Sequence, residues 1–342
     1  MRLTLIAALL LIAAPSSQDW LDIYREPAAR LITEAQSTDF AWQRLAELTD
    51  TFGNRLSGSE NLERAIGWAL AEMKKDGLNA RTEPAMVPRW TRGDERLDMI
   101  KPASQPIVMV GLGMSVGTPA AGIQAPVLVV KSFDDLKARA AEAKGRIVLF
   151  NVPFTNYGTT VAYRSSGPSE AAKLGAVAAL VRSVGPIGLR TPHTGALNYA
   201  EDAPRIPAAA IPVEDAERLQ RLQDRGIETV LRLKMDARLE PGLVPSANVI
   251  GEIRGREHPD EIVLLGGHFD SWDVGTGATD DGVGCIVTWE AVRLIQKLGL
   301  KPRRTIRVVL WTNEENGLHG ARAYAAQHAA AAKSHVLALE SD

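Results

Sequence analysis

The final third of the chain alternates short apolar runs with longer amphipathic stretches. Nearly continuous apolar runs occupy residues 261–267 (EIVLLGG), 305–312 (TIRVVLWT) and 335–339 (HVLAL), which is typical of strands buried on both faces of a sheet. Between them, residues 284–298 carry apolar side chains at helical spacing, and the alanine-rich residues 318–333 favour a second helix. The order strand, helix, strand, helix, strand predicts a parallel sheet with crossover helices.

The N-terminal region shows a pattern of amphipathic helices followed by strands. A polar loop at residues 51–59 (TFGNRLSGS) separates the two helical stretches. Asn54 and Arg55 in this loop could reach a functional site, but a turn that ends in a helix cap at Ser59 is the favoured interpretation. The predicted elements are helices at residues 41–48 and 60–75, then strands at residues 78–87 and 90–99.

The middle of the chain, residues 116–235, is richer in glycine, proline and alanine than the regions beside it. Short apolar runs alternate there with helical stretches, which predicts a small mixed α/β unit. His193 is interpreted as an ordinary loop residue, because no carboxylate or second histidine is near it in the sequence. The predicted elements are strands at residues 125–130, 145–151, 177–182 and 206–211, and helices at residues 169–174 and 213–225.

Composition narrows the function only modestly. The 39 Lys and Arg residues nearly balance the 41 Asp and Glu residues, which argues against a nucleic-acid-binding surface or a polybasic membrane anchor. A length of 342 residues gives two domains as the first expectation. Cys285 is the only cysteine, so no internal disulfide can form, and its place on the apolar face of a predicted helix indicates a packing role.

Residues 1–17 follow the pattern of a secretory signal peptide. A basic start at Arg2 precedes the apolar residues 3–14 (LTLIAALLLIAA) and a region of small residues, and the apolar run is too short to span a membrane. A buried N-terminal helix is the alternative interpretation. We expect a secreted or periplasmic protein without membrane contact after cleavage, because no other long apolar run remains.

Polar side chains follow the ends of the predicted strands in the final third of the chain. His268 ends the first of these strands, Glu314 and Glu315 follow the second, and Asp342 follows the third. Asp280 lies just before a predicted helix, where the helix dipole favours a carboxylate. Because ligands bind beyond the carboxyl ends of parallel strands, we expect one imidazole and four carboxylates to gather on one rim of the sheet.

This set of side chains suits zinc chemistry. Zinc accepts neutral imidazole and carboxylate ligands, and the carboxylate of Asp270, two residues after His268, could fix the tautomer of the ring. A bridging carboxylate such as Asp280 can hold two metal ions about 3.5–4 Å apart. Of the adjacent Glu314 and Glu315, one can bind metal while the other remains free as a general base.

Four motifs in order resemble the co-catalytic dinuclear zinc exopeptidases, and most closely their carboxypeptidase Q branch. They are GGHFDSWD, DDG, LWTNEENG and ESD, between residues 266 and 342. The resemblance implies that His268 and Asp342 bind one zinc ion and that Asp280 bridges two. Glu315 would then bind the second zinc ion, and Glu314 would be the general base.

The same resemblance implies two local features and one expectation about the chain's extent. Asp270 would orient His268, and a cis peptide bond would join Asp280 to Asp281. The family's last zinc ligand is a histidine well beyond the ESD motif, and this sequence ends at Asp342. We therefore expect the sequence to be a fragment of a longer enzyme.

The resemblance also implies a domain order and a class of substrate. The fold would be a mixed, largely parallel sheet with helices on both faces, interrupted by a protease-associated α/β domain that shapes access to the site. Substrates would be dipeptides or short peptides with free termini, although a hydrolase of N-acylated amino acids would use the same chemistry. A homodimer is left open. The implied domains are residues 18–115 and 236–342 for the peptidase, with an incomplete catalytic core, and residues 116–235 for the insert.

Two alternative functions need weighing. Ser115 lies in a GxSxG pattern (GMSVG), which in serine hydrolases requires a strand before the serine and a helix after it. Residues 118–122 (TPAAG) do not favour a helix, so this alternative is disfavoured, and the sequence also contains no HExxH motif. The second alternative is a catalytically degenerate binding protein of the same fold, in which the carboxylates only cap helices.

Overall fold

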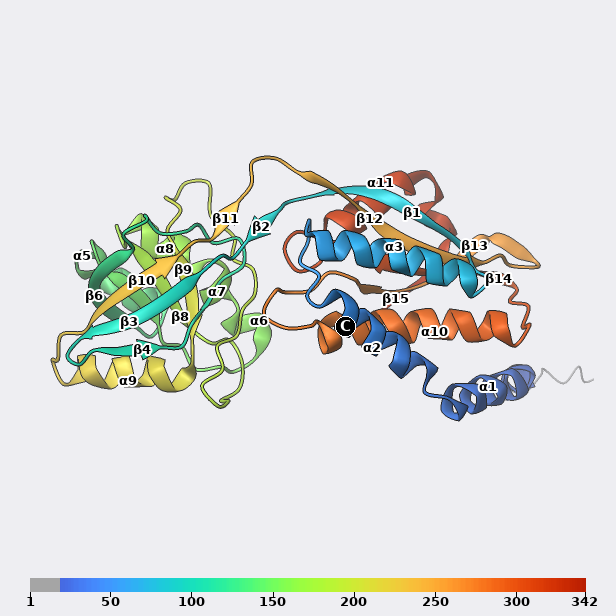
Figure 1. Ribbon diagram of the computed structural model, residues 1–342, viewed down its shortest axis with the longest axis horizontal. Helices are drawn as coiled ribbons and strands as arrows, with labels where there is room; N and C mark the ends of the chain where they lie inside the picture. Colours follow the sequence, from blue (N-terminus) through green and yellow to red (C-terminus); the bar gives the residue numbers. More distant parts are fainter. Residues whose placement is uncertain (1–18) are drawn as a thin grey trace, which may run out of the picture.

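The computed structural model describes residues 19–342, and the signal peptide predicted for residues 1–17 lies outside them. The described residues form two units that lie side by side (Figure 1). Within them, no helix is both long and apolar enough to cross a membrane. The first unit contains residues 19–87 and 244–342, and the second unit contains residues 90–239.

The first unit is built on a five-stranded sheet. Its strands are β1 (Asn79–Val87), β12 (Val244–Ile253), β13 (His258–His268), β14 (Arg304–Trp311) and β15 (His335–Glu340). In space they follow the order β1-β12-β14-β13-β15. The three C-terminal strands pair in parallel, as predicted, but β1 and β12 pair antiparallel, so the sheet is mixed without being largely parallel. Strand β12 was not predicted, because it contains Pro245 and proline disfavours a strand that is paired on both sides.

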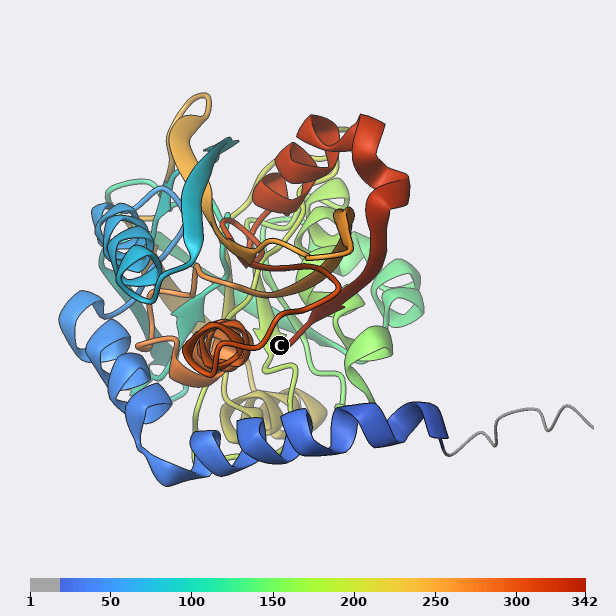
Figure 2. The same cartoon turned by 90° about the vertical axis from the view of Figure 1, so that its right-hand side faces the viewer.

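Helices cover both faces of this sheet, as predicted (Figure 2). Val308 and Leu310 of β14 pack with α2, α3 and α10 on one face, whereas Val309 packs with α11 on the other. This alternation explains why the run in β14 is apolar throughout. The predicted cap of α3 is confirmed, because Ser59 Oγ accepts a hydrogen bond from the Leu62 N–H at 3.2 Å. The helices are α1 (Asp19–Ser37), α2 (Phe40–Phe52), α3 (Glu60–Lys75), α10 (Val283–Lys297), α11 (His319–Gln327) and the 3₁₀ helix η2 (Ala329–Ser334).

The second unit is built on an eight-stranded sheet. Its strands are β3 (Glu95–Lys101), β4 (Gln105–Ile107), β5 (Val110–Gly111), β6 (Ile123–Val130), β7 (Ile147–Phe150), β8 (Ala178–Arg182), β9 (Ala208–Ile211) and β10 (Val230–Met235). They follow the order β4-β3-β10-β6-β7-β8-β9-β5, with parallel pairing from β6 to β9. The helices are α4 (Phe133–Ala138), α5 (Ala140–Ala143), α6 (Tyr157–Thr160), α7 (Ala162–Ser165), α8 (Gly167–Lys173) and α9 (Val213–Asp224).

The second sheet begins earlier in the chain than residue 116. Strand β3 pairs antiparallel with both β4 and β10, so residues 95–111 belong to the second unit rather than to the N-terminal part of the peptidase domain. An apolar alternation predicts a strand but does not predict the strand with which it pairs. The sequence boundary was therefore placed too late.

The chain enters and leaves the second unit at one place (Figure 1). It leaves the first unit after β1 and returns in β12, and these strands are antiparallel neighbours whose ends pair Val87 with Val244. Just beyond them, the short strands β2 (Trp90–Thr91) and β11 (Arg238–Leu239) also pair antiparallel. The second unit is thus inserted between two adjacent strands of the first sheet.

Candidate metal centre

Three side chains converge at the carboxyl ends of β13 and β15. His268 is the last residue of β13, Asp342 follows β15, and Asp280 lies in the kinked turn η1 (Ala278–Gly282) before α10. His268 Nε2 is 3.0 Å from Asp280 Oδ1 and 3.8 Å from Asp342 Oδ1, and one ligand atom from each residue lies within 4.8 Å of the others. The parallel strands therefore bring three of the four predicted ligands together.

His268 is held with one ring nitrogen toward this cluster. Its side chain is 1 % exposed, whereas the two carboxylates are each 63 % exposed, so the cluster opens to solvent on the carboxylate side. His268 Nδ1 is 3.0 Å from the backbone oxygen of Asp270. Because a carbonyl can only accept, this contact places the proton on Nδ1 and leaves the Nε2 lone pair free for a metal ion.

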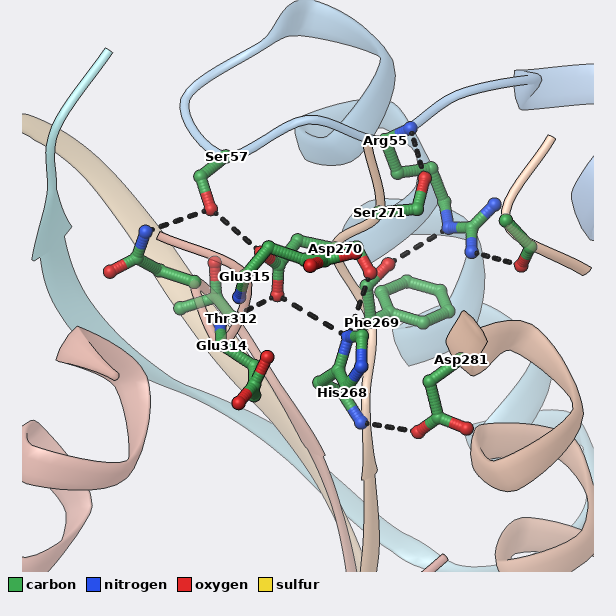
Figure 3. A network of polar contacts seen from close by, with 12 residues as sticks. Arg55, Ser57, His268, Phe269, Asp270, Ser271, Asp281, Thr312, Glu314 and Glu315 are labelled. Carbon is green, nitrogen blue, oxygen red and sulfur yellow. Dashed lines mark hydrogen bonds and ion pairs between the residues drawn. The ribbon is translucent and has the colours of Figure 1, made fainter. Parts of the chain in front are cut away.

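The orienting role predicted for the Asp270 carboxylate therefore needs a correction. Its Oδ1 is 3.9 Å from His268 Nδ1, which is too far for a hydrogen bond, and the backbone carbonyl of Asp270 orients the ring instead. The carboxylate faces three other donors (Figure 3): the Glu314 N–H at 2.9 Å, the Glu315 N–H at 3.3 Å and the Ser57 hydroxyl at 3.0 Å. It thus holds the Glu314–Glu315 segment beside β13.

Glu314 and Glu315 lie close to the cluster but not within it. Both line the same cavity as Asp280. Burial raises the pKa of Glu315 to about 8, assisted by the negative charges of Asp280 and Asp270. Burial also raises the pKa of Glu314. The structure therefore places the adjacent pair within electrostatic range of the candidate ligands.

The charges at this rim indicate the kind of ion that the site suits. Burial acts to lower the pKa of His268, but the hydrogen bond with Asp280 and the charges of nearby carboxylates outweigh it and raise the pKa to about 10. The raised pKa values of His268 and Glu315 both reflect the crowding of negative charge at this rim. A divalent cation would compensate this charge, and imidazole plus carboxylate oxygens are ligands that zinc accepts. The residues present therefore fit a zinc ion.

Asp281 is a supporting residue that the sequence reasoning missed. The predicted cis peptide bond between Asp280 and Asp281 is present. The Asp281 carboxylate accepts hydrogen bonds from the His268 N–H at 2.8 Å and the Gly284 N–H at 3.0 Å, and so links β13 to the start of α10. A Cβ at Gly284 would come 2.1 Å from Asp281 Oδ1. The glycines around the DDG motif were the available signal for this close approach.

Arg55 supports the loop that connects the ligands. Its side chain is fully buried and donates hydrogen bonds to backbone oxygens, including those of Phe269 at 2.8 Å, Thr276 at 2.8 Å and Gly277 at 2.9 Å. It does not belong to the ligand cluster. The cap interpretation for its loop was correct, but it overlooked this arginine, because the partners lie more than two hundred residues away in sequence.

A cavity of about 590 Å³ lies against the cluster, between the two units. The first unit contributes Asp280, Glu314 and Glu315, and the second unit contributes His193 and Arg164. His193 lies in a loop, as expected, but it faces this cavity. Its pKa is lowered by burial and by the charge of Arg164. Distance in sequence was thus a poor guide to its surroundings. The cavity's other lining residues include Tyr157, Pro192, Thr194, Gly195, Ala196, Trp272 and residues 274–279.

The structure contradicts the nucleophile-elbow interpretation of Ser115. This serine is completely buried, its hydroxyl donates to the Val116 backbone oxygen at 2.9 Å, and it accepts from the Ala208 N–H at 2.9 Å. No helix follows it in the described chain until α4. Ser115 therefore stabilises the second unit rather than presenting a nucleophile. Cys285 is also completely buried, in agreement with its predicted packing role.

Comparison with known proteins relates this fold and site to one family. A model described as peptidase family M28 matches residues 248–342. Carboxypeptidase Q from Pongo abelii is 50 % identical over 303 residues, which cover 88 % of this chain and 64 % of that relative's length. A crystal structure of a peptidase M28 precursor from Shewanella amazonensis SB2B is 39 % identical, with a TM-score of 0.90 over 94 % of this chain and 74 % of that chain.

The chain belongs to peptidase family M28. Its resemblance to the carboxypeptidase Q branch is confirmed by the identity with that relative, of whose length the chain spans just under two thirds. A zinc aminopeptidase from Bacillus subtilis shares the fold at 23 % identity, with a TM-score of 0.63 over 84 % of this chain and 64 % of that chain.

Proposed function

We propose that this chain carries the metal-binding core of a zinc-dependent exopeptidase that hydrolyses dipeptides or other short peptides. One observation carries the proposal: the buried His268 directs Nε2 at two exposed carboxylates, and a glutamate pair lines the cavity beside them. Membership of the M28 family and the fold shared with a zinc aminopeptidase support zinc as the metal.

The ligands divide between two ions in this proposal. His268 and Asp342 would bind the first zinc ion, Asp280 would be shared between the two ions, and Glu315 would bind the second. The position of Asp280 supports the shared role, since it lies 3.0 Å from His268 and its charge also acts on Glu315. Zinc bound there supplies a Lewis acid that polarises a peptide carbonyl and acidifies a water molecule.

Glu314 moves the proton in this proposal. Its backbone N–H is fixed by Asp270, and its half-buried side chain lines the cavity without belonging to the ligand cluster. Burial raises its pKa above the ordinary value of a glutamate, and this direction favours a group that must both accept and donate a proton. The carboxylate takes a proton from the attacking water and returns it to the leaving amine as the carbon–nitrogen bond breaks.

The test combines metal analysis with turnover of a dipeptide. The purified protein should contain zinc by mass spectrometry of the metal and should hydrolyse a dipeptide such as alanyl-leucine. A strong chelator should abolish hydrolysis, and added zinc should restore it. A protein that binds zinc but hydrolyses no peptide would favour the degenerate binding protein, and one that binds no zinc would contradict the proposal as a whole.

We further propose that the protein acts in a periplasm or outside the cell. The signal-like pattern of residues 1–17 and the single cysteine support this location. Fractionation of cells that express the protein with its own N-terminus tests the proposal. Recovery in the cytoplasmic fraction, with the N-terminus intact, would contradict it.

A further inference from the structure

One tryptophan of the first unit is seated in the second unit. Trp272 belongs to the loop that follows β13, shortly after His268. Its ring packs against the hydrophobic core of the second unit and lies edge-on to Trp90, with the ring centroids 6.4 Å apart. Trp90 is itself buried, and its Nε1 donates a hydrogen bond to the Ser115 backbone oxygen at 2.8 Å. The loop that leaves the candidate metal centre therefore reaches into the other unit before it returns with Asp280.

A glycine of the second unit forms the socket for this ring. A Cβ on Gly113 would come 1.9 Å from Trp272 Cη2, so any side chain at this position would displace the indole. The backbone of Gly113 is fixed within the second unit, because its N–H donates to the Gly195 backbone oxygen and its own oxygen accepts from the Leu197 N–H, both at 3.0 Å. Gly113 is the first residue of the GMSVG segment. This glycine thus has a structural explanation, which is to leave space for a side chain of the first unit.

An ion pair fixes the next residue of the same loop. Asp273 accepts two hydrogen bonds from Arg92 of the second unit, one from Nε at 2.9 Å and one from Nη2 at 2.6 Å. Arg92 is 9 % exposed, and its Nη1 donates to the Gly111 backbone oxygen. Glu95 lies 3.6 Å from the same guanidinium and accepts from the Gly111 N–H at 2.9 Å. A two-point contact between guanidinium and carboxylate is specific in geometry, so it sets the angle between the units as well as their separation.

The first unit holds this loop on both sides of the contact. The Arg55 backbone N–H donates to Ser271 Oγ at 3.0 Å, and its guanidinium donates to the Gly277 backbone oxygen at 2.9 Å. Trp272 and Asp273 extend toward the second unit from the stretch between these two anchors. The loop therefore has its own support in the first unit, and its two extended side chains position the second unit.

The position of the second unit decides how large the cavity beside the metal centre is. The cavity has a volume of about 590 Å³, and Trp272 is one of its lining residues. Such a volume is typical of sites that bind small molecules. Glu314 and Glu315 line it from the first unit, and residues 192–196 line it from the second. Movement of the second unit away from the first would therefore enlarge the space that a substrate can occupy.

We propose that Trp272 and Asp273, held by Gly113 and Arg92, form a clasp that fixes the second unit against the metal centre and limits substrates to short peptides. The inference rests on the proposed peptidase function and deepens it, because it names residues that set the length of the substrate. They are positioning residues, and none of them is a candidate ligand or proton carrier. Within residues 19–342, the chain crosses between the units only beside the paired strands β2 and β11. Without the clasp, the second unit is freer to turn about that connection.

Hydrogen exchange followed by mass spectrometry tests the clasp without relying on turnover. Trp272→Ala should speed the exchange of residues 110–115 by about tenfold or more, although the substituted residue lies in the other unit. The parallel strands β6 to β9 should exchange as they do in the wild-type protein. Zinc content should also stay unchanged, because Arg55 still holds the loop. Unchanged exchange in residues 110–115, or a loss of zinc, would overturn the proposal.

A comparison of a dipeptide with a hexapeptide tests the limit on length. The wild-type protein should hydrolyse alanyl-leucine with a kcat/KM about tenfold or more above that of pentaalanyl-leucine. In Trp272→Ala this ratio should fall by about five- to tenfold, because the dipeptide is held less well and the longer peptide gains room. Equal losses on both peptides would leave the ratio unchanged and would overturn the proposal.

Binding of the same two peptides distinguishes failure of the clasp from failure of the peptidase function. Calorimetry in the Glu314→Gln background should show tighter binding of the dipeptide than of the hexapeptide, and adding Trp272→Ala should reduce the difference. If the wild-type protein hydrolyses neither peptide but binding changes in this way, the peptidase function fails while the clasp stands. An unchanged difference in binding would overturn the clasp.

Two further variants separate the clasp from a general effect on stability. Asp273→Asn removes the charge that pairs with Arg92 and keeps the size of the side chain, so the ratio should fall by about two- to fivefold. This variant decides if Trp272→Ala does not fold, and an unchanged ratio in it would overturn the proposal. Glu217→Gln is the matched control, because Glu217 lies 3.2 Å from Arg182, another buried arginine, within the second unit. It should change neither the exchange of residues 110–115 nor the ratio, and an equal change there would overturn the proposal.

Discussion

The two walls of the cavity satisfy their polar groups in different ways. On the wall of the first unit, the buried Asp270 accepts three hydrogen bonds and Asp281 accepts two. Arg55 reaches several carbonyls of the loop behind them. On the wall of the second unit, Arg164 is nearly as buried but leaves Nε without a partner. The buried carboxylates behind the ligands thus accept several hydrogen bonds each, whereas Arg164 keeps one buried donor without a partner.

The hydrogen bonds of the first unit suit the binding of a metal ion. A metal ion requires ligands held in one geometry, and the saturated hydrogen bonds behind His268 provide that rigidity before the ion binds. The second unit adds no ligand to this cluster, although it lines the cavity beside it. The candidate metal ligands of the described residues thus all lie in the first unit.

Removing Asp280, the ligand that both ions would share, should have the largest effect on zinc binding and turnover. Asp280→Asn should lose bound zinc and reduce turnover by about a thousandfold or more, because it removes a charge on which both ions depend. Metal analysis and dipeptide hydrolysis measure the two effects. Asp260→Asn is the control, since this exposed aspartate lies on β13 far from His268. Unchanged zinc content in Asp280→Asn would contradict the shared role.

The adjacent glutamates allow metal binding to be separated from proton transfer. Glu314→Gln should keep its zinc and lose turnover by about a hundredfold or more, because only the proton acceptor is removed. Glu315→Gln should instead lower the zinc content, because it removes a ligand. The same two assays on both variants give the comparison. If Glu314→Gln lost zinc and Glu315→Gln kept it, the two roles would have to be exchanged.

A smaller effect is expected from the support behind the ligands. Asp270→Asn puts an amide where the backbone N–H groups of Glu314 and Glu315 need acceptors, so these segments should shift. Zinc affinity should fall by about ten- to a hundredfold, as for other residues that hold ligands in place. Competition with a zinc chelator measures the affinity. Asp98→Asn, on strand β3 of the second unit, should leave it unchanged. An unchanged zinc affinity in Asp270→Asn would show that zinc binding does not depend on the Asp270 carboxylate.

The sequence predicted the metal ligands of the first unit far better than the residues of the second unit that line the same cavity. The apolar runs of β13, β14 and β15 are local signals, and a parallel sheet brings the residues at their ends to one rim. His268, Asp280 and Asp342 could therefore be predicted together. Asp281 and Arg55 were missed because their roles depend on how a loop folds back onto backbone groups, and no local periodicity encodes such contacts.

The part of the cavity that the second unit lines could not be predicted for a different reason. Arg164 and His193 lie in the second unit, and nothing in their sequence neighbourhoods indicates a site. They face Asp280 only because the chain leaves the first sheet after β1 and returns in β12. Residues 95–111 were misplaced for the same reason, since pairing between distant strands decides which sheet a segment joins.

The neighbouring entry and exit strands of the second unit also shape how this family can evolve. Paired strands lie about 4.8 Å apart, so the chain passes from the first unit to the second and back at what is almost a single point. Insertions or deletions in the segment between β2 and β11 therefore need not change the separation of the ends of β1 and β12. During evolution, the length and sequence of the second unit can therefore vary while the first sheet keeps its strand order.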